Sequence, residues 1–186
     1  MWGTHTRYES WCCVTSAPCG GDRSSGVCII LSGRFASRQL NRGRIGSRGC
    51  WIRIQGPVCN LLLICVYLPP LYTKAAEFVA VMKGIREVLT DRSLHDCVVL
   101  FGDFNVNFPS RYQNIIGPYA RKQGERRIRR RTRDLLDLFA RYDMCVPSTY
   151  FRPKRNQTFD TWRGNKRRGS RPRGQIDYIA ASQRWR

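Results

Sequence analysis

Asp103 and Asn105 stand two residues apart where an apolar run ends, in the segment 98–105 (Val-Val-Leu-Phe-Gly-Asp-Phe-Asn). Alternate residues of a strand point to the same side of a sheet, so the carboxylate and the carboxamide are expected to face one site. Gly102 permits a close backbone approach or a positive φ just before them. A carboxylate beside an amide suits a hard cation and a phosphate oxygen. Asp and Asn after a strand are also typical of a simple turn, so the motif alone leaves both interpretations open.

Three further polar residues lie in segments that are otherwise apolar or strand-like: Tyr67, Thr161 and Asp177. The phenol of Tyr67 could orient a phosphate or an attacking water, or the ring could be a core aromatic. The hydroxyl of Thr161 could bind a phosphate, although Thr is also a good strand former. Asp177 needs a partner, because burying an unpaired charge is costly. A catalytic His, a metal ion and an Arg are the candidate partners.

The elements that must position these residues follow from the hydrophobic pattern. Apolar runs predict strands at 26–32, 60–67 and 96–101, and alternation of apolar and charged residues predicts one at 50–54. Apolar residues with a period near 3.6 predict helices at 73–89, with Thr73 as N-cap, and at 132–142. Shorter strands are predicted at 144–146, 149–151, 159–162 and 176–181, and irregular segments at 1–25, 37–49 and 104–119. Strands and helices that alternate without a repeat predict an α/β fold.

The charge of the chain predicts a polyanionic partner. Lys and Arg total 33 against 13 Asp and Glu, a net charge of +20. Such an excess points most often to nucleic acid and less often to an anionic membrane surface. The basic residues gather in two blocks, at 121–133 and 152–173, and the first block contains Arg129, Arg130 and Arg131. A solvated surface and a nuclear-localisation patch are the alternative interpretations.

Cysteine usage and hydropathy indicate the compartment. The nine cysteines are an odd number without regular spacing, which argues against a disulfide framework and for reduced thiols. The N-terminus lacks the apolar core of a signal peptide, and the longest apolar stretch, 58–68, is too short to span a bilayer. We therefore expect a soluble protein that is not secreted, and a nuclear location follows from its basicity.

The segments 66–70 (Val-Tyr-Leu-Pro-Pro), 102–105 (Gly-Asp-Phe-Asn) and 176–179 (Ile-Asp-Tyr-Ile) resemble motifs of the endonuclease/exonuclease/phosphatase superfamily. They follow one another in the family's order and at about its spacing. Within that superfamily the chain is most similar to the apurinic-type endonuclease domain of non-LTR (LINE-type) retrotransposons. This resemblance implies a four-layer α/β sandwich, in which two packed mixed β-sheets are flanked by helices. It divides the chain into an irregular N-terminal segment, 1–25, and a partial domain of this family, 26–186.

The resemblance also implies roles for the candidate residues in metal-dependent hydrolysis of a DNA phosphodiester. Asp103 would orient or activate the attacking water, and Asn105 would hold the scissile phosphate. Tyr67 would contact that phosphate, and Thr161 would line the cleft beside it. Asp177 would hold the family's catalytic His in the right tautomer. Mg²⁺ is the implied cofactor, with no metal ligand assigned in this chain.

The resemblance to the family implies DNA as the partner, with no membrane and no inferable protein partner. The basic residues Arg129, Arg130 and Arg131 would contact the DNA backbone, which positions the protein without reading sequence. These three arginines are therefore predicted substrate-binding residues, although they lie outside the three family motifs.

Two parts of the family pattern are not recognisable in the chain. The first is the strand-end Glu that serves as the chief metal ligand, and the second is the Ser-Asp-His element that carries the catalytic His. Glu9 stands in a different context, and His5 and His95 lie elsewhere in the sequence. We therefore expect a domain truncated at both ends. A catalytically inactive, basic nucleic-acid-binding remnant is the alternative hypothesis, and a phospholipid or inositol phosphate substrate is a third.

Overall fold

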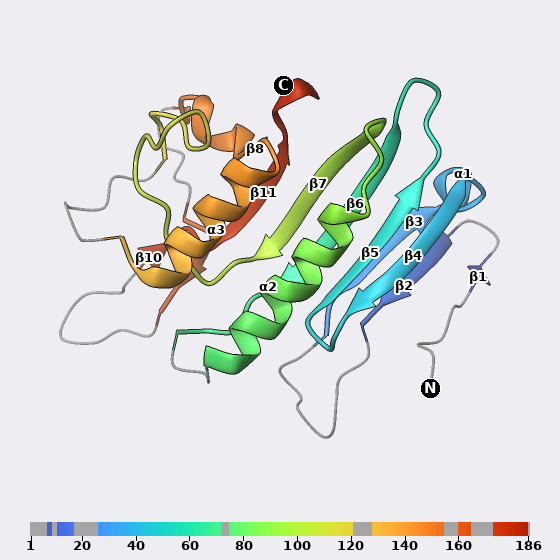
Figure 1. The fold of residues 1–186 in the computed structure, drawn as a ribbon, viewed down its shortest axis with the longest axis horizontal. Helices are drawn as coiled ribbons and strands as arrows, with labels where there is room; N and C mark the ends of the chain where they lie inside the picture. Colours follow the sequence, from blue (N-terminus) through green and yellow to red (C-terminus); the bar gives the residue numbers. More distant parts are fainter. Residues whose placement is uncertain are drawn as a thin grey trace. The chain divides into compact units, whose positions relative to one another are not determined.

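The computed structural model describes residues 7–8, 11–16, 26–71, 75–120, 128–154, 160–164 and 173–185. The chain divides into two compact units, Met1–Gly102 and Asp103–Arg186 (Figure 1). Within the described part of the chain, no helix is both long enough and apolar enough to cross a membrane. The predicted N-cap Thr73 lies outside the described residues.

The first unit contains two sheets and two helices. One sheet has the order β1-β2-β3, and the strands of the other lie in the order β4, β5, β6 and β7. The elements are β1 (Arg7–Tyr8), β2 (Trp11–Thr15), β3 (Cys28–Ser32), α1 (Gly33–Ala36), β4 (Gln39–Ile45), β5 (Gly49–Ile54), β6 (Asn60–Tyr67), α2 (Ala75–Thr90) and β7 (Asp96–Asp103). The predictions of strands at 26–32, 50–54, 60–67 and 96–101 and of a helix at 73–89 are confirmed within a few residues.

The two sheets of the first unit pack face to face through one apolar cluster. Side chains of β2 and β3 meet those of β5 and β6 there: Val14, Ile29, Leu31, Cys50, Ile52, Ile54 and Cys65. Side chains alternate along a strand, so the residues of β5 and β6 between these point to the other face. On that face α2 packs against β4, where a Cβ added to Gly84 would lie 2.6 Å from Ile45. The larger sheet is therefore covered on both faces, as the apolar run of β6 predicted.

Three strands of the first unit were not predicted: β1, β2 and β4. The expectation of an irregular segment at 1–25 is wrong for β2, which pairs antiparallel with β3. The sequence of β2, Trp-Cys-Cys-Val-Thr, does not alternate between apolar and polar residues. The expectation of a loop at 37–49 is wrong for β4, a mostly exposed edge strand that carries Arg42 and Arg44. Charged residues are common on edge strands, where they replace the apolar pattern and oppose aggregation.

The second unit contains α3 (Arg130–Arg141), β8 (Met144–Cys145), a 3₁₀ helix η1 (Pro147–Tyr150), β9 (Trp162–Arg163), β10 (Arg173–Gly174), β11 (Asp177–Ser182) and a second 3₁₀ helix η2 (Gln183–Trp185). Strand β11 pairs antiparallel with β8, and β9 pairs antiparallel with β10. The helix predicted at 132–142 and the strand predicted at 176–181 are confirmed. The strand predicted at 149–151 is wrong, because Pro147 begins a 3₁₀ turn that the Thr149 hydroxyl closes by donating to the Val146 carbonyl at 2.6 Å.

An aromatic cluster forms the core of the second unit. Phe104, Phe108, Phe139 and Tyr178 are buried, and their contacting rings have centroids 4.6–6.4 Å apart. The Tyr178 hydroxyl donates to the carbonyl of Gln175 at 2.7 Å and accepts the N–H of Phe108 at 3.5 Å. This core therefore fixes the segment after β7 against the residues that precede β11.

Candidate functional site

The Asp103–Asn105 motif forms a turn whose geometry fixes the carboxylate. Asn105 has a φ of 48° and donates its backbone N–H to Asp103 Oδ1 at 2.9 Å. Asn tolerates this left-handed conformation better than most residues. The turn interpretation of the motif is thus confirmed. It does not compete with the chemical one, because the same hydrogen bond sets the direction of the Asp103 carboxylate.

Gly102, in the first unit, shows why a glycine precedes the motif. Its φ is 134°, and an added Cβ would lie 2.0 Å from the carbonyl oxygen of Val66. No larger residue fits there without moving β6 or β7. The predicted close backbone approach is therefore confirmed. Gly102 and Val66 immediately precede Asp103 and Tyr67 in the sequence.

Asp177 and Thr161 meet the Asp103 turn within the second unit. The N–H of Phe104 donates to the carbonyl of Ile176 at 2.8 Å, so the turn runs beside the start of β11. The Thr161 hydroxyl oxygen accepts the backbone N–H groups of Ile176 at 3.0 Å and Asp177 at 3.1 Å. A hydroxyl that accepts hydrogen bonds still has its own O–H to donate. Thr161 can therefore hold the start of β11 and also bind a phosphate oxygen.

The two carboxylates influence each other. Burial raises the pKa of Asp103 from 3.8 to about 6, and the negative charge of Asp177 also raises it, while hydrogen bonds from Asn105 oppose the rise. A cation bound near Asp103 would oppose this rise in its pKa. A carboxylate with a pKa close to neutral is also suited to accept a proton from water.

The oxygen ligands of this cluster fit a magnesium ion. The described residues contain no group of three or more His, Cys, Asp and Glu side chains placed to hold a metal. Mg²⁺, however, is commonly held by one or two carboxylates together with substrate phosphates and water. For such an ion, Asp103 and Asp177 would supply the carboxylates and Asn105 a carboxamide oxygen.

The described residues place no histidine beside Asp177, and the sequence contains no recognisable counterpart of the family's catalytic His. His95 is exposed and precedes the first residue of β7, whereas Asp103 is the last residue of that strand. His5 lies outside the described residues. The role of Asp177 in holding a His therefore stays a prediction.

Tyr67, the last residue of β6, belongs to the first unit. Its N–H donates to the carbonyl of Arg48 at 2.8 Å, and the guanidinium carbon of Arg48 lies 5.2 Å from the centroid of its ring. Arg48 in turn forms an ion pair with Glu77 of α2 at 3.1 Å. Sequence reasoning missed Arg48 and Glu77, since neither lies in a motif. The phosphate contact of Tyr67 stays a prediction.

Arg129, Arg130 and Arg131 lie at the N-terminus of α3. Arg129 is the N-cap residue without a side-chain capping bond, and the first turn contains no acidic residue. Positive charge at this end of a helix opposes the helix dipole. The helix dipole therefore does not favour arginines at these positions. The rest of the first basic block, 121–127, lies outside the described residues.

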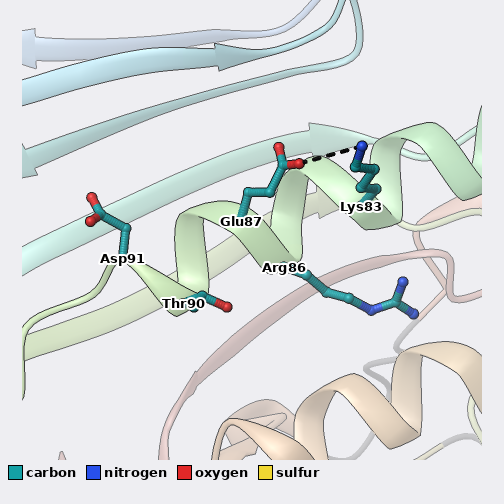
Figure 2. A pocket seen from close by; sticks show the side chains of 5 residues that line it. All are labelled: Lys83, Arg86, Glu87, Thr90 and Asp91. Carbon is teal, nitrogen blue, oxygen red and sulfur yellow. Dashed lines mark ion pairs between the residues drawn. The ribbon is translucent and has the colours of Figure 1, made fainter.

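A hollow near the end of α2 contains none of the candidate residues. It measures about 490 Å³ and is lined by Lys83, Arg86, Glu87, Thr90 and Asp91. Figure 2 shows the Lys83–Glu87 ion pair, 3.8 Å long, on one side of the helix, with Arg86 pointing away from it. An exposed pair of this kind contributes little to stability. The residues that line the hollow include none of the Asp103 cluster.

Solved structures of nucleases match most of the chain. The AP endonuclease LMAP from Leishmania major matches 95% of this chain and 63% of its own, with a TM-score of 0.62 and 13% identity. The endonuclease domain of TRAS1, a telomere-specific non-LTR retrotransposon, matches 92% of this chain and 68% of its own, with a TM-score of 0.56 and 12% identity. D. rerio TDP2, complexed with a single-strand DNA product, matches 94% of this chain and 62% of its own, with a TM-score of 0.54 and 16% identity. The chain therefore has the α/β sandwich fold of the endonuclease/exonuclease/phosphatase proteins, and the predicted fold class is confirmed.

Among curated proteins, the chain is similar to craniofacial development protein 2 from Bos taurus. The two are 26% identical over 165 residues, which cover 88% of this chain and 26% of the relative. The chain thus spans about a quarter of the length of the curated relatives that it matches. No protein-family model matches the chain. The comparisons establish a nuclease-type fold, within which activity and substrate remain to be proposed.

Proposed function

We propose that the chain is a metal-dependent phosphodiesterase domain that acts on DNA as an endonuclease, of retrotransposon origin. The observation that carries the proposal is the Asp103 turn beside Asp177, with the pKa of Asp103 raised to about 6. The matched fold supports it, because it is shared with an AP endonuclease and with the endonuclease domain of a non-LTR retrotransposon.

The chemistry proposed is attack of water on a DNA phosphorus. Asp103 takes a proton from the water, and the new P–O bond forms as the bond from phosphorus to the 3′ oxygen breaks. The departing 3′ oxygen takes a proton from solvent to give the 3′-hydroxyl. The Asn105 amide and the Thr161 hydroxyl donate hydrogen bonds to phosphate oxygens, whose negative charge grows in the transition state. The phenol of Tyr67 is proposed separately as a phosphate contact of the first unit. Mg²⁺, when bound, neutralises and polarises the phosphate.

The DNA substrate is proposed from charge. A net charge of +20 attracts a long polyanion, and Arg129, Arg130 and Arg131 are available to bind its backbone phosphates. A nuclear location goes with this substrate. The single-strand DNA product in the matched TDP2 structure belongs to that protein and supports the substrate class here by similarity of fold alone.

Nicking of supercoiled plasmid by the full chain tests the proposal. We expect nicking with Mg²⁺ and none with EDTA, and a loss of about 10²–10⁴-fold in rate for Asp103→Asn. The matched control is Asp137→Asn, which neutralises an exposed carboxylate of α3 in the same unit. Nicking that survives Asp103→Asn, or that ignores EDTA, would contradict the proposed mechanism.

A basic nucleic-acid-binding domain without cleavage is the second candidate. It is favoured by the net charge of +20 and by the lack of a recognisable metal-binding Glu and catalytic His in the sequence. It predicts duplex binding by the chain with no nicking in either condition. A binding comparison between duplex DNA and vesicles of anionic phospholipid separates both DNA hypotheses from a phospholipid or inositol phosphate substrate, because only the latter predicts a preference for the vesicles.

A further inference from the structure

We infer that Arg48 is a positioning residue, which fixes the orientation of the Tyr67 ring at the end of β6. This inference rests on the proposed function, because Tyr67 is there a phosphate contact. Every interaction that carries it lies within the first unit, between the turn that joins β4 and β5, the end of β6, and α2.

Arg48 holds Tyr67 at two points. Its carbonyl accepts the N–H of Tyr67 at 2.8 Å, which fixes the backbone at the end of β6. Its guanidinium carbon lies 5.2 Å from the centroid of the Tyr67 ring, within the range of a cation–π interaction. The backbone bond survives substitution of Arg48, whereas the contact with the ring depends on the guanidinium. The ring contact is therefore the part that a side-chain variant removes.

Glu77 holds the guanidinium in place. Arg48 Nη2 and Glu77 Oε2 are 3.1 Å apart, and the Arg48 side chain is only 9% exposed, against 45% for Glu77. A buried guanidinium requires a charged partner, since the cost of removing it from water is large. The partly exposed carboxylate reaches in from α2 and supplies that partner. The ion pair with Glu77 therefore keeps the Arg48 guanidinium over the face of the Tyr67 ring.

A second ion pair of the same sheet provides the matched control. Arg53, on β5, pairs with buried Asp96 at 3.0 Å and also donates to the carbonyl of Asp91 at 3.0 Å. It lies at the far end of β5 from the turn that carries Arg48. Replacing Arg53 therefore removes a second, more deeply buried ion pair of the first unit while the Arg48–Tyr67 contact is kept. A loss of stability alone would affect both variants.

The test combines fluorine NMR of the full chain, labelled with 3-fluorotyrosine, with nicking kinetics. The chain has eight tyrosines, and the Tyr67 line is identified as the one missing in Tyr67→Phe. We expect Arg48→Met to displace the Tyr67 line by more than its width, Arg48→Lys to displace it less, and Arg53→Met to leave it in place. In the nicking assay, Arg48→Met is expected to lower kcat about 10-fold with little change in KM, because the reacting geometry loosens.

Each outcome decides a separate claim. A Tyr67 line that stays in place in Arg48→Met overturns the inference, as does a displaced line with an unchanged kcat. A wild-type chain that does not nick contradicts the proposed function, while the NMR line still decides whether Arg48 holds the ring. Should Arg48→Met not fold, Glu77→Gln takes its place, because it releases the guanidinium without opening a cavity. An unmoved line in that variant likewise overturns the inference.

Discussion

Asp103 is the residue whose ionisation sets the pH dependence of the proposed reaction. Burial, with a further contribution from Asp177, raises its pKa to about 6. Only the deprotonated carboxylate can accept a proton from water, so the nicking rate is expected to rise with pH through about 6 and to level off above it. Initial rates from about pH 5 to about pH 8 at fixed Mg²⁺ check this. Asp177→Asn removes a charge that raises the pKa of Asp103, so, where activity remains, the midpoint of the pH–rate profile should move to lower pH. A nicking rate that does not change with pH would exclude Asp103 as the base.

The same carboxyl group costs the fold stability near neutral pH. A pKa raised from 3.8 to about 6 gives stability that is present below 3.8 and is lost as the pH rises through about 6. Asp103→Asn keeps an acceptor for the Asn105 N–H, so we expect it to raise the free energy of unfolding at neutral pH. The gain is about 1 kcal/mol, a value reduced because the carboxyl is half exposed.

Urea unfolding at neutral pH and at a pH below 3.8 measures this effect, which should vanish at the lower pH. Asp137→Asn, on the exposed face of α3, is the control. A variant that gains stability while losing nicking would mark Asp103 as a residue kept for chemistry. Loss of stability at neutral pH would instead make the carboxylate a structural group.

At the scale of elements, Thr161 connects the short strand β9 to the start of β11. Its hydroxyl accepts two backbone N–H groups, those of Ile176 and Asp177. Thr161→Val removes that acceptor at nearly constant shape and is expected to cost about 1 kcal/mol, because water partly replaces the hydroxyl at this exposed position. Thr161→Ser keeps the hydroxyl and should retain most of the stability. Urea unfolding of both variants checks the difference; equal stabilities would show that the hydroxyl does not hold β11.

The elements that could be predicted are those that bury enough apolar side chains to produce a regular hydrophobic pattern in the sequence. Strand β6 is a run of apolar residues because both of its faces are covered, and α3 turns Leu135, Leu136, Leu138 and Phe139 inward at helical spacing. Strand β4 is different, since an exposed edge strand needs no apolar face. Its place in the sheet comes from pairing with β5, a contact that a local pattern does not encode.

The candidate site divides in the same way. Asp103, Asn105, Thr161 and Asp177 could be predicted because each stands in a short segment with a polar group at a strand end. The hydrogen bonds that join the Asp103 turn to β11 connect residues far apart in the sequence, so they could not be predicted from local patterns. Arg48 and Glu77 are 29 residues apart and lie in segments without a motif. A residue that acts on another residue, rather than on a ligand, leaves no such local signal.

At the scale of the whole molecule, the charge of +20 predicts DNA binding that weakens steeply with salt. Each phosphate contact releases counterions and contributes about 0.9 to the slope of log affinity against log salt. Replacing Arg129, Arg130 and Arg131 with Gln should therefore lower the slope by about 2 to 3 while leaving sequence preference unchanged. Fluorescence anisotropy with labelled duplex DNA over a series of salt concentrations measures it.

The matched control for this slope is Arg42→Gln with Arg44→Gln, on the exposed edge strand β4. If net charge alone attracted the DNA, the control and the α3 variant would both lower the affinity in proportion to the charge removed. Neither would then change the slope of log affinity against log salt by the value expected for one phosphate contact, about 0.9. A slope that falls only in the α3 variant assigns the phosphate contacts to the start of that helix. An unchanged slope would remove Arg129, Arg130 and Arg131 from the interface and leave their unfavourable position at the positive end of α3 without a ligand to explain it.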